Sequence, residues 1–141
     1  MTDPAGLPSA IGVQELDRRL ADADEPRPLL VDVREQHEIV AARIDGLVIM
    51  PMSQFGLRFR ELPADRPLLV ICASGNRSGM ASAHLIANGY SASNVLGGMH
   101  AWERAGLPVR RGPLAPGEGS IRGDGRSAGD GRLPDEDSDP D

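Results

Sequence analysis

Residues 67–78 read PLLVICASGNRS, and they join an apolar segment to a polar one. The apolar segment, 68–71, contains only Leu, Val and Ile, which is typical of a strand buried on both faces of a sheet. In the polar segment, Gly75 and Asn76 can adopt left-handed backbone angles at low cost. We therefore expect a strand that ends at Cys72, then a loop, and then a helix over 80–88 that stops at Gly89.

Strand-like and helix-like segments alternate along the rest of the chain. Further apolar runs that predict strands lie at 29–33, 47–50 and 94–96, and helical patterns lie at 13–22, 35–41 and 101–105. Phe55, Phe59 and Leu62 fall on one face of another expected helix, for which Ser53 could be the N-terminal cap. This alternation predicts an α/β domain with a mostly parallel sheet and helices on both faces.

The loop that begins at Cys72 can form an anion-binding bowl. In open α/β sheets, ligands bind at the carboxyl ends of the strands, where this loop lies. Its N–H groups and the following helix N-terminus can stabilise a negative charge, and Arg77 adds a positive charge or braces the loop. A cysteine at the base of such a bowl should have a lowered pKa and act as a nucleophile. The expected site comprises Cys72 as nucleophile, Ala73, Ser74, Gly75, Asn76, Arg77 and Ser78 as the loop, and Asp32 and Arg34 in support.

Composition excludes several other classes of protein. The chain has 141 residues and a net charge of -6, and residues 112–141 carry eight acids against three Arg. The body is therefore nearly neutral, which argues against a nucleic-acid surface. We find no apolar run of about 18 residues and no secretory signal, so we expect a cytoplasmic protein that does not contact membranes. Cys72 is the only cysteine, so an internal disulfide and a thiolate metal cluster are excluded, and we expect neither metal nor cofactor.

Composition also divides the chain into three parts. Residues 1–9 form an N-terminal extension, and residues 10–111 form one domain. Residues 112–141 contain seven Gly, four Pro and no aromatic residue, so they cannot bury enough surface to offset the entropy of ordering. We therefore expect an acidic, disordered tail after residue 111.

Three motifs give the chain a resemblance to a known family. The segment from Cys72 to Ser78, in which four residues separate Cys72 from Arg77, resembles the active-site loop of the rhodanese-like sulfurtransferases. Residues 30–35 (LVDVRE) and 97–109 (GGMHAWERAGLPV) resemble the first and closing signatures of that family. The resemblance covers about residues 10–110, in the family's order and spacing. It implies a single rhodanese-like domain with a central five-stranded sheet.

The resemblance also implies a reaction and its partners. Cys72 would take a sulfur atom from a small donor such as thiosulfate and hold it as a persulfide. Cyanide or a cellular thiol, which could belong to a thiol-carrying protein, would then accept the sulfur. The chain departs from the family's usual sequence at two places outside the three motifs. Residues 42–47 read ARIDGL where the family often has GHIPGA, and Ile49 replaces a common Asn. Ala73 stands where many members that use thiosulfate have a basic residue, which weakens the case for thiosulfate itself.

Two alternative functions remain. Some rhodanese-like domains are non-catalytic binding or regulatory modules, but those lack the cysteine that this chain has. Cysteine phosphatases and arsenate reductases resemble this loop too, but their loop has five residues between Cys and Arg. The shorter loop favours a sulfur atom over a tetrahedral phosphoryl group.

Overall fold

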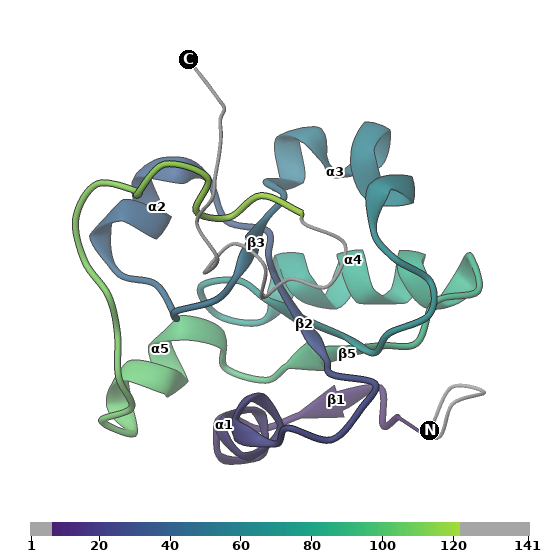
Figure 1. The fold of residues 1–141 in the computed structure, drawn as a ribbon, viewed down its shortest axis with the longest axis horizontal. Coiled ribbons are helices and arrows are strands. Elements are labelled where there is room, and N and C mark those ends of the chain that lie inside the picture. Colours follow the sequence, from purple (N-terminus) through teal and green to yellow (C-terminus); the bar gives the residue numbers. More distant parts are fainter. Residues whose placement is uncertain (1–6, 122–141) are drawn as a thin grey trace.

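Five parallel strands form the centre of the molecule (Figure 1). The computed structural model describes residues 7–121. The strands are β1 (Ala10–Ile11), β2 (Leu29–Asp32), β3 (Val48–Ile49), β4 (Leu68–Ile71) and β5 (Ala92–Val95), in the sheet order β1-β5-β4-β2-β3. The predicted α/β fold with a parallel sheet is confirmed. The apolar runs did not reveal β1, because two residues are too few to show a pattern.

Helices cover both faces of this sheet (Figure 1). They are α1 (Val13–Ala21), α2 (Gln36–Ala41), α3 (Met52–Arg58), α4 (Asn76–Ala87) and α5 (Gly98–Arg104), with a 3-10 turn at Phe59–Glu61. Side chains of β4 alternate between two apolar cores, which α3 and α4 complete on one face and α1 and α5 on the other. Both faces of β4 are therefore buried, which explains its unbroken apolar sequence. Within residues 7–121, no helix is long and apolar enough to cross a membrane.

The helix after the Cys72 loop begins earlier than predicted. It starts at Asn76 rather than at residue 80, because Gly75 takes a left-handed conformation (φ 105°) and turns the chain directly into the helix. Asn76, Arg77 and Ser78 thus lie in the first turn of α4, not in the loop. The cap predicted for α3 is also wrong, because Pro51 precedes its first turn and Ser53 lies inside it.

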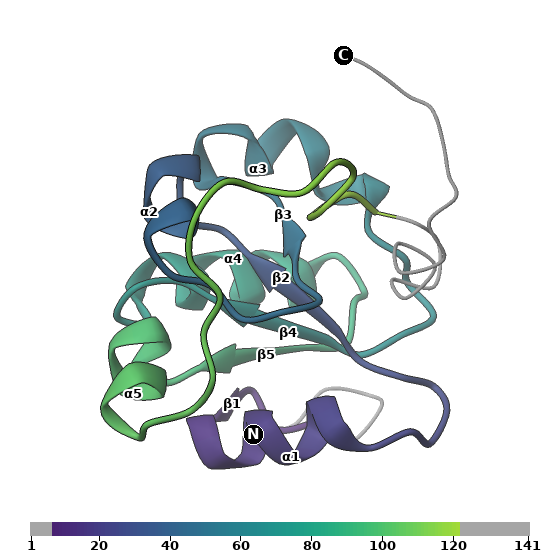
Figure 2. The ribbon, with the colours of Figure 1, turned by 60° about the vertical axis from the view of Figure 1, so that its left-hand side comes forward.

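Residues 112–121, which we call the C-terminal strap, differ from the disordered tail expected after residue 111. Gly112 N–H donates to the Val40 carbonyl (2.9 Å), and Ile49 N–H donates to the Gly119 carbonyl (2.8 Å). The strap passes α2 and then reaches the outer edge of β3, where Gly119 pairs with Val48 (Figure 2). Composition misses it because backbone hydrogen bonds and an ion pair to Glu118 order the segment, in addition to the packing of Ile121 on the core. The remainder of the expected tail, 122–141, lies outside the described residues, as do residues 1–6 of the expected N-terminal extension.

One buried arginine fastens the strap to the domain. Arg43 is 1% exposed and donates to both carboxylate oxygens of Glu118 (2.6 and 3.1 Å). It also donates to the carbonyls of Gly112 (2.7 Å) and Pro113 (3.3 Å). Arg43 lies in the segment where the chain departs from the family motif, so this departure has a structural role in binding the strap.

We expect Arg43→Met to lower the free energy of unfolding by about 3 kcal/mol, because it leaves Glu118 with only the Ala115 N–H as donor among the described residues and removes the donor to the carbonyls of Gly112 and Pro113. The matched control is Arg110→Met, which breaks an exposed pair with Asp45 (3.4 Å) and should cost about 0.5 kcal/mol or less. Urea unfolding measures both. Equal losses for the two variants would contradict the role given to Arg43.

Candidate active site

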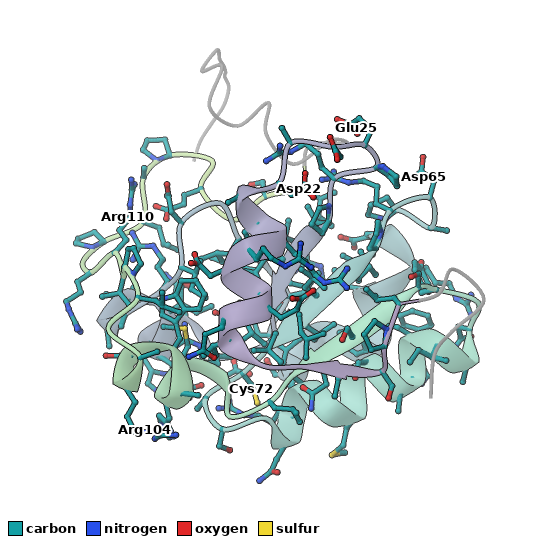
Figure 3. The ribbon with its side chains drawn as sticks, turned by 90° about the horizontal axis from the view of Figure 1, so that it is seen from below. Asp22, Glu25, Asp65, Cys72, Arg104 and Arg110 are labelled. Carbon is teal, nitrogen blue, oxygen red and sulfur yellow. The ribbon has the colours of Figure 1, made fainter. Side chains whose placement is uncertain are left out.

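Cys72 follows β4 directly and lies at the base of a tight loop (Figure 3). The residue is fully buried. Its Sγ accepts a hydrogen bond from Gly75 N–H (3.1 Å) and lies 3.2 Å from the Ser78 hydroxyl. The loop and the first turn of α4 thus place donors around the sulfur.

The surroundings of Cys72 favour its thiolate. Burial alone would raise the pKa of Cys72. Hydrogen bonds from the Ser78 hydroxyl and from the N–H groups of Ser78, Gly75 and Ser74 act in the opposite direction and outweigh burial. The pKa of Cys72 is therefore held below its ordinary value, as expected for a cysteine whose anion meets several fixed donors at a helix N-terminus.

The first turn of α5 holds the Cys72 loop from behind. Met99 N–H donates to the Cys72 carbonyl (2.9 Å), and His100 N–H donates to the Ala73 carbonyl (3.0 Å). This approach is possible only because residue 98 is glycine: a Cβ on Gly98 would lie 2.3 Å from the Cys72 carbonyl oxygen. The first turn of α5 therefore satisfies the carbonyls of the loop whose N–H groups donate to the sulfur.

Arg77 braces the site rather than standing free. Its guanidinium donates twice to the Glu38 carboxylate of α2, with both N–O distances at 2.8 Å. These hydrogen bonds lower the pKa of Glu38 to about 2 and raise the pKa of Arg77. The pair joins α2 to α4. Its charges largely neutralise each other, although Arg77 still feels the charge of Cys72.

Asp32 and Arg34 form a buried ion pair at the end of β2. Arg34 donates to both Asp32 oxygens, with a shortest distance of 2.8 Å, and neither side chain is more than 5% exposed. Arg34 also donates to the carbonyls of Glu38 (3.1 Å) and Ala42 (2.8 Å). The pair therefore fixes α2, which carries Glu38, and the supporting role of Asp32 and Arg34 at the site stays a prediction.

The remaining predicted loop residues have different exposures. Ala73 is half-buried, whereas Ser74 and Asn76 are exposed at the rim. Three further residues contact the Cys72 loop or the first turn of α4 and were not predicted as site residues, namely Glu38, Asn94 and Gly98. Gly98 belongs to the closing signature at 97–109, which the sequence shows. No local pattern links Glu38 or Asn94 to Cys72. Among residues 7–121, no cluster of three or more His, Cys, Asp or Glu could hold a metal ion.

Known proteins share the sequence pattern and the fold of this chain. The family model for the rhodanese-like domain matches residues 12–105. A protein named sulfurtransferase from Allochromatium vinosum is 40% identical over 70% of this chain and 92% of its own length. The thiosulfate sulfurtransferase GlpE of Actinobacillus succinogenes is 32% identical over 57% of this chain and 74% of its own.

A solved structure supports the same assignment. The crystal structure of a rhodanese-related protein from Thermoplasma volcanium superposes with a TM-score of 0.67 and is 29% identical. It covers 73% of this chain, and the match spans 98% of that protein. The motifs, the parallel sheet and the buried cysteine loop thus lead to one assignment: this chain belongs to the rhodanese-like domain family.

Proposed function

We propose that this protein is a sulfurtransferase that carries sulfur on Cys72. The observation that supports this most directly is the ring of N–H and O–H donors around the Cys72 sulfur, which lowers the pKa of that thiol. A thiolate formed in this way needs no separate base to become a nucleophile. Relatives that are named sulfurtransferases support the same activity.

The reaction takes place in two displacement steps. The Cys72 thiolate attacks the outer sulfur of a donor such as thiosulfate, and an S–S bond forms on Cys72. The donor's own S–S bond breaks, and sulfite leaves with the electron pair. An acceptor, either cyanide or a thiolate, then attacks the outer sulfur of the persulfide and releases Cys72 as thiolate. The donors of Gly75 and Ser78 stabilise the anionic sulfur in both forms.

The partners we propose are small. Cys72 has no exposed surface, so an elongated donor or acceptor must place one reactive atom into the loop. Thiosulfate, a low-molecular-weight persulfide, cyanide and a thiol on a flexible protein segment all meet this requirement. Ala73 adds no charge to the loop and Arg77 is paired with Glu38, so attraction of an anionic donor depends on the N–H groups of the loop. The cytoplasmic location stays a prediction from the sequence.

Mass spectrometry of the sulfur-loaded protein tests this function. The wild type is incubated with thiosulfate, or separately with glutathione persulfide, and freed of small molecules. A gain of about 32 Da that cyanide removes supports the persulfide. Protein alkylated at Cys72 beforehand is the control and should gain nothing.

The two donors distinguish the alternatives. Loading by the persulfide alone would remove thiosulfate from the proposal but keep sulfur transfer. Loading by neither donor would overturn the proposal and favour the binding module, whereas turnover of an aryl phosphate would favour a phosphatase.

A further inference from the structure

Asn94 and Cys72 both lie within hydrogen-bond distance of a single hydroxyl. Ser78 Oγ is 2.6 Å from Asn94 Oδ1 and 3.2 Å from Cys72 Sγ. A serine hydroxyl has one hydrogen, so Ser78 can donate to only one of these acceptors at a time. The shorter distance is the one to Asn94.

The orientation of the Asn94 amide is fixed by its second contact. Its Nδ2 donates to the Gly75 carbonyl (3.2 Å), so Oδ1 must face Ser78. The opposite orientation would place two carbonyl oxygens against each other. Gly79 makes room for this amide, because a Cβ at residue 79 would lie 3.3 Å from Nδ2. Asn94 is therefore held as an acceptor for the Ser78 hydroxyl.

We propose that Asn94 is a positioning residue that competes with Cys72 for the Ser78 hydroxyl. In the thiol form, Ser78 donates to Asn94 Oδ1, and the Cys72 S–H can donate to Ser78 Oγ. When the sulfur becomes anionic, as thiolate or as persulfide, the hydroxyl turns to the sulfur and leaves Asn94 Oδ1. The inference rests on the proposed function for its catalytic meaning, but the competition itself follows from the geometry.

This competition has a consequence that a purely structural role does not have. Formation of the anion costs the hydrogen bond to Asn94, so removal of Asn94 should make the anion easier to form. A residue that merely holds the loop in place would have the opposite effect, because a loosened loop would stabilise the anion less. Gly75 O also accepts a hydrogen bond from Gly79 N–H (3.1 Å), so the loop keeps a partner when Asn94 is removed. A fall in the pKa of Cys72 on removal of Asn94 therefore indicates competition for the hydroxyl, whereas a rise indicates a purely structural role.

The other charged and titratable groups near Cys72 are unchanged by replacing Asn94. These groups are Arg77 on α4, Glu38 on α2, the Asp32–Arg34 pair at the end of β2, and His100 on α5. The strand that carries Asn94, β5, has the sequence ASNV and contributes no titratable group. A changed pKa of Cys72 in an uncharged Asn94 variant therefore reflects a change in the hydrogen bonding of the Ser78 hydroxyl.

The experiment measures the rate of Cys72 alkylation by iodoacetamide against pH, which requires no sulfur donor. We expect Asn94→Ala to lower the apparent pKa of Cys72 by about half a unit to one unit. The limiting rate at high pH should fall about two-fold, because a less basic thiolate is a weaker nucleophile. An unchanged or raised pKa would overturn the proposal.

A double-mutant cycle tests whether Asn94 acts through Ser78. Ser78→Ala should raise the pKa, and adding Asn94→Ala to that variant should change it no further. If Asn94→Ala still changed the pKa of Cys72 in the Ser78→Ala variant, the proposal would be overturned. The matched control is Ser93→Ala on the same strand, because Ser93 Oγ is buried and has no hydrogen-bond partner among the described residues. That variant should titrate like the wild type.

A second variant covers the case in which Asn94→Ala does not fold. Asn94→Leu preserves the branched shape of the side chain and removes the acceptor without adding a charge, so we expect it to lower the pKa of Cys72 as Asn94→Ala does. A raised or unchanged pKa in this variant would also overturn the proposal. Alkylation requires no sulfur transfer, so this experiment tests the competition for the Ser78 hydroxyl separately from the proposed function. Either one can be overturned while the other stands.

Discussion

Cys72→Ser is expected to lower the rate of thiosulfate:cyanide sulfurtransfer at least about 1,000-fold, to the level of the uncatalysed reaction. A serine hydroxyl ionises only far above neutral pH and cannot hold a transferable sulfur atom. Because Cys72 is the only cysteine, no other thiol can replace it. The measurement is thiocyanate formation by the wild type and the variant under identical conditions.

The fold of this variant should remain intact. Serine is slightly smaller than cysteine and can accept the same bonds from Gly75 and Ser78, so a urea midpoint close to that of the wild type is the control. Sulfur transfer by a folded Cys72→Ser protein would contradict the persulfide mechanism. In the wild type, the rate of Cys72 alkylation should rise with pH through a midpoint below that of an ordinary thiol, because the folded pKa is lowered.

Gly98→Ala is expected to lower the sulfur-transfer rate about 100-fold and the free energy of unfolding by about 3 kcal/mol. The new Cβ would lie 2.3 Å from the Cys72 carbonyl oxygen and 2.7 Å from the Ala73 carbonyl carbon and oxygen, all of them backbone atoms. The loop must therefore move away from α5, and the hydrogen bonds from Met99 and His100 break. Sulfur-transfer assays and urea unfolding measure the two effects.

Gly106→Ala is the matched control for this prediction. Gly106 follows α5 and has a similar left-handed conformation (φ 75°, against 54° at Gly98), but a Cβ there would meet nothing within 4 Å. The control should lose about 1 kcal/mol from backbone strain and keep its activity. Equal losses of activity in the two variants would show that strain, rather than contact with the Cys72 loop, explains the effect at Gly98.

Local pattern predicted much of the fold and the centre of the site. The run 68–71 predicted a strand buried on both faces, and β4 has that position, with alternate side chains in two cores. Boundaries were harder to predict, because Gly75 ends the loop with a backbone angle that the sequence allows but does not require. The tail boundary was wrong for residues 112–121, because its contacts lie about 70 residues away in the sequence.

The sequence by itself determined the α/β fold, because the alternation of strand-like and helix-like segments can be read from neighbouring residues, and it predicted Cys72 as the nucleophile. Only the tertiary structure decided that Arg77 binds Glu38, that Gly98 lies beneath the Cys72 carbonyl and that Asn94 shares the Ser78 hydroxyl. These contacts join residues 16 to 39 positions apart, so they depend on how helices pack on the sheet. Periodicity and spacing describe one segment at a time, and packing brings the segments together.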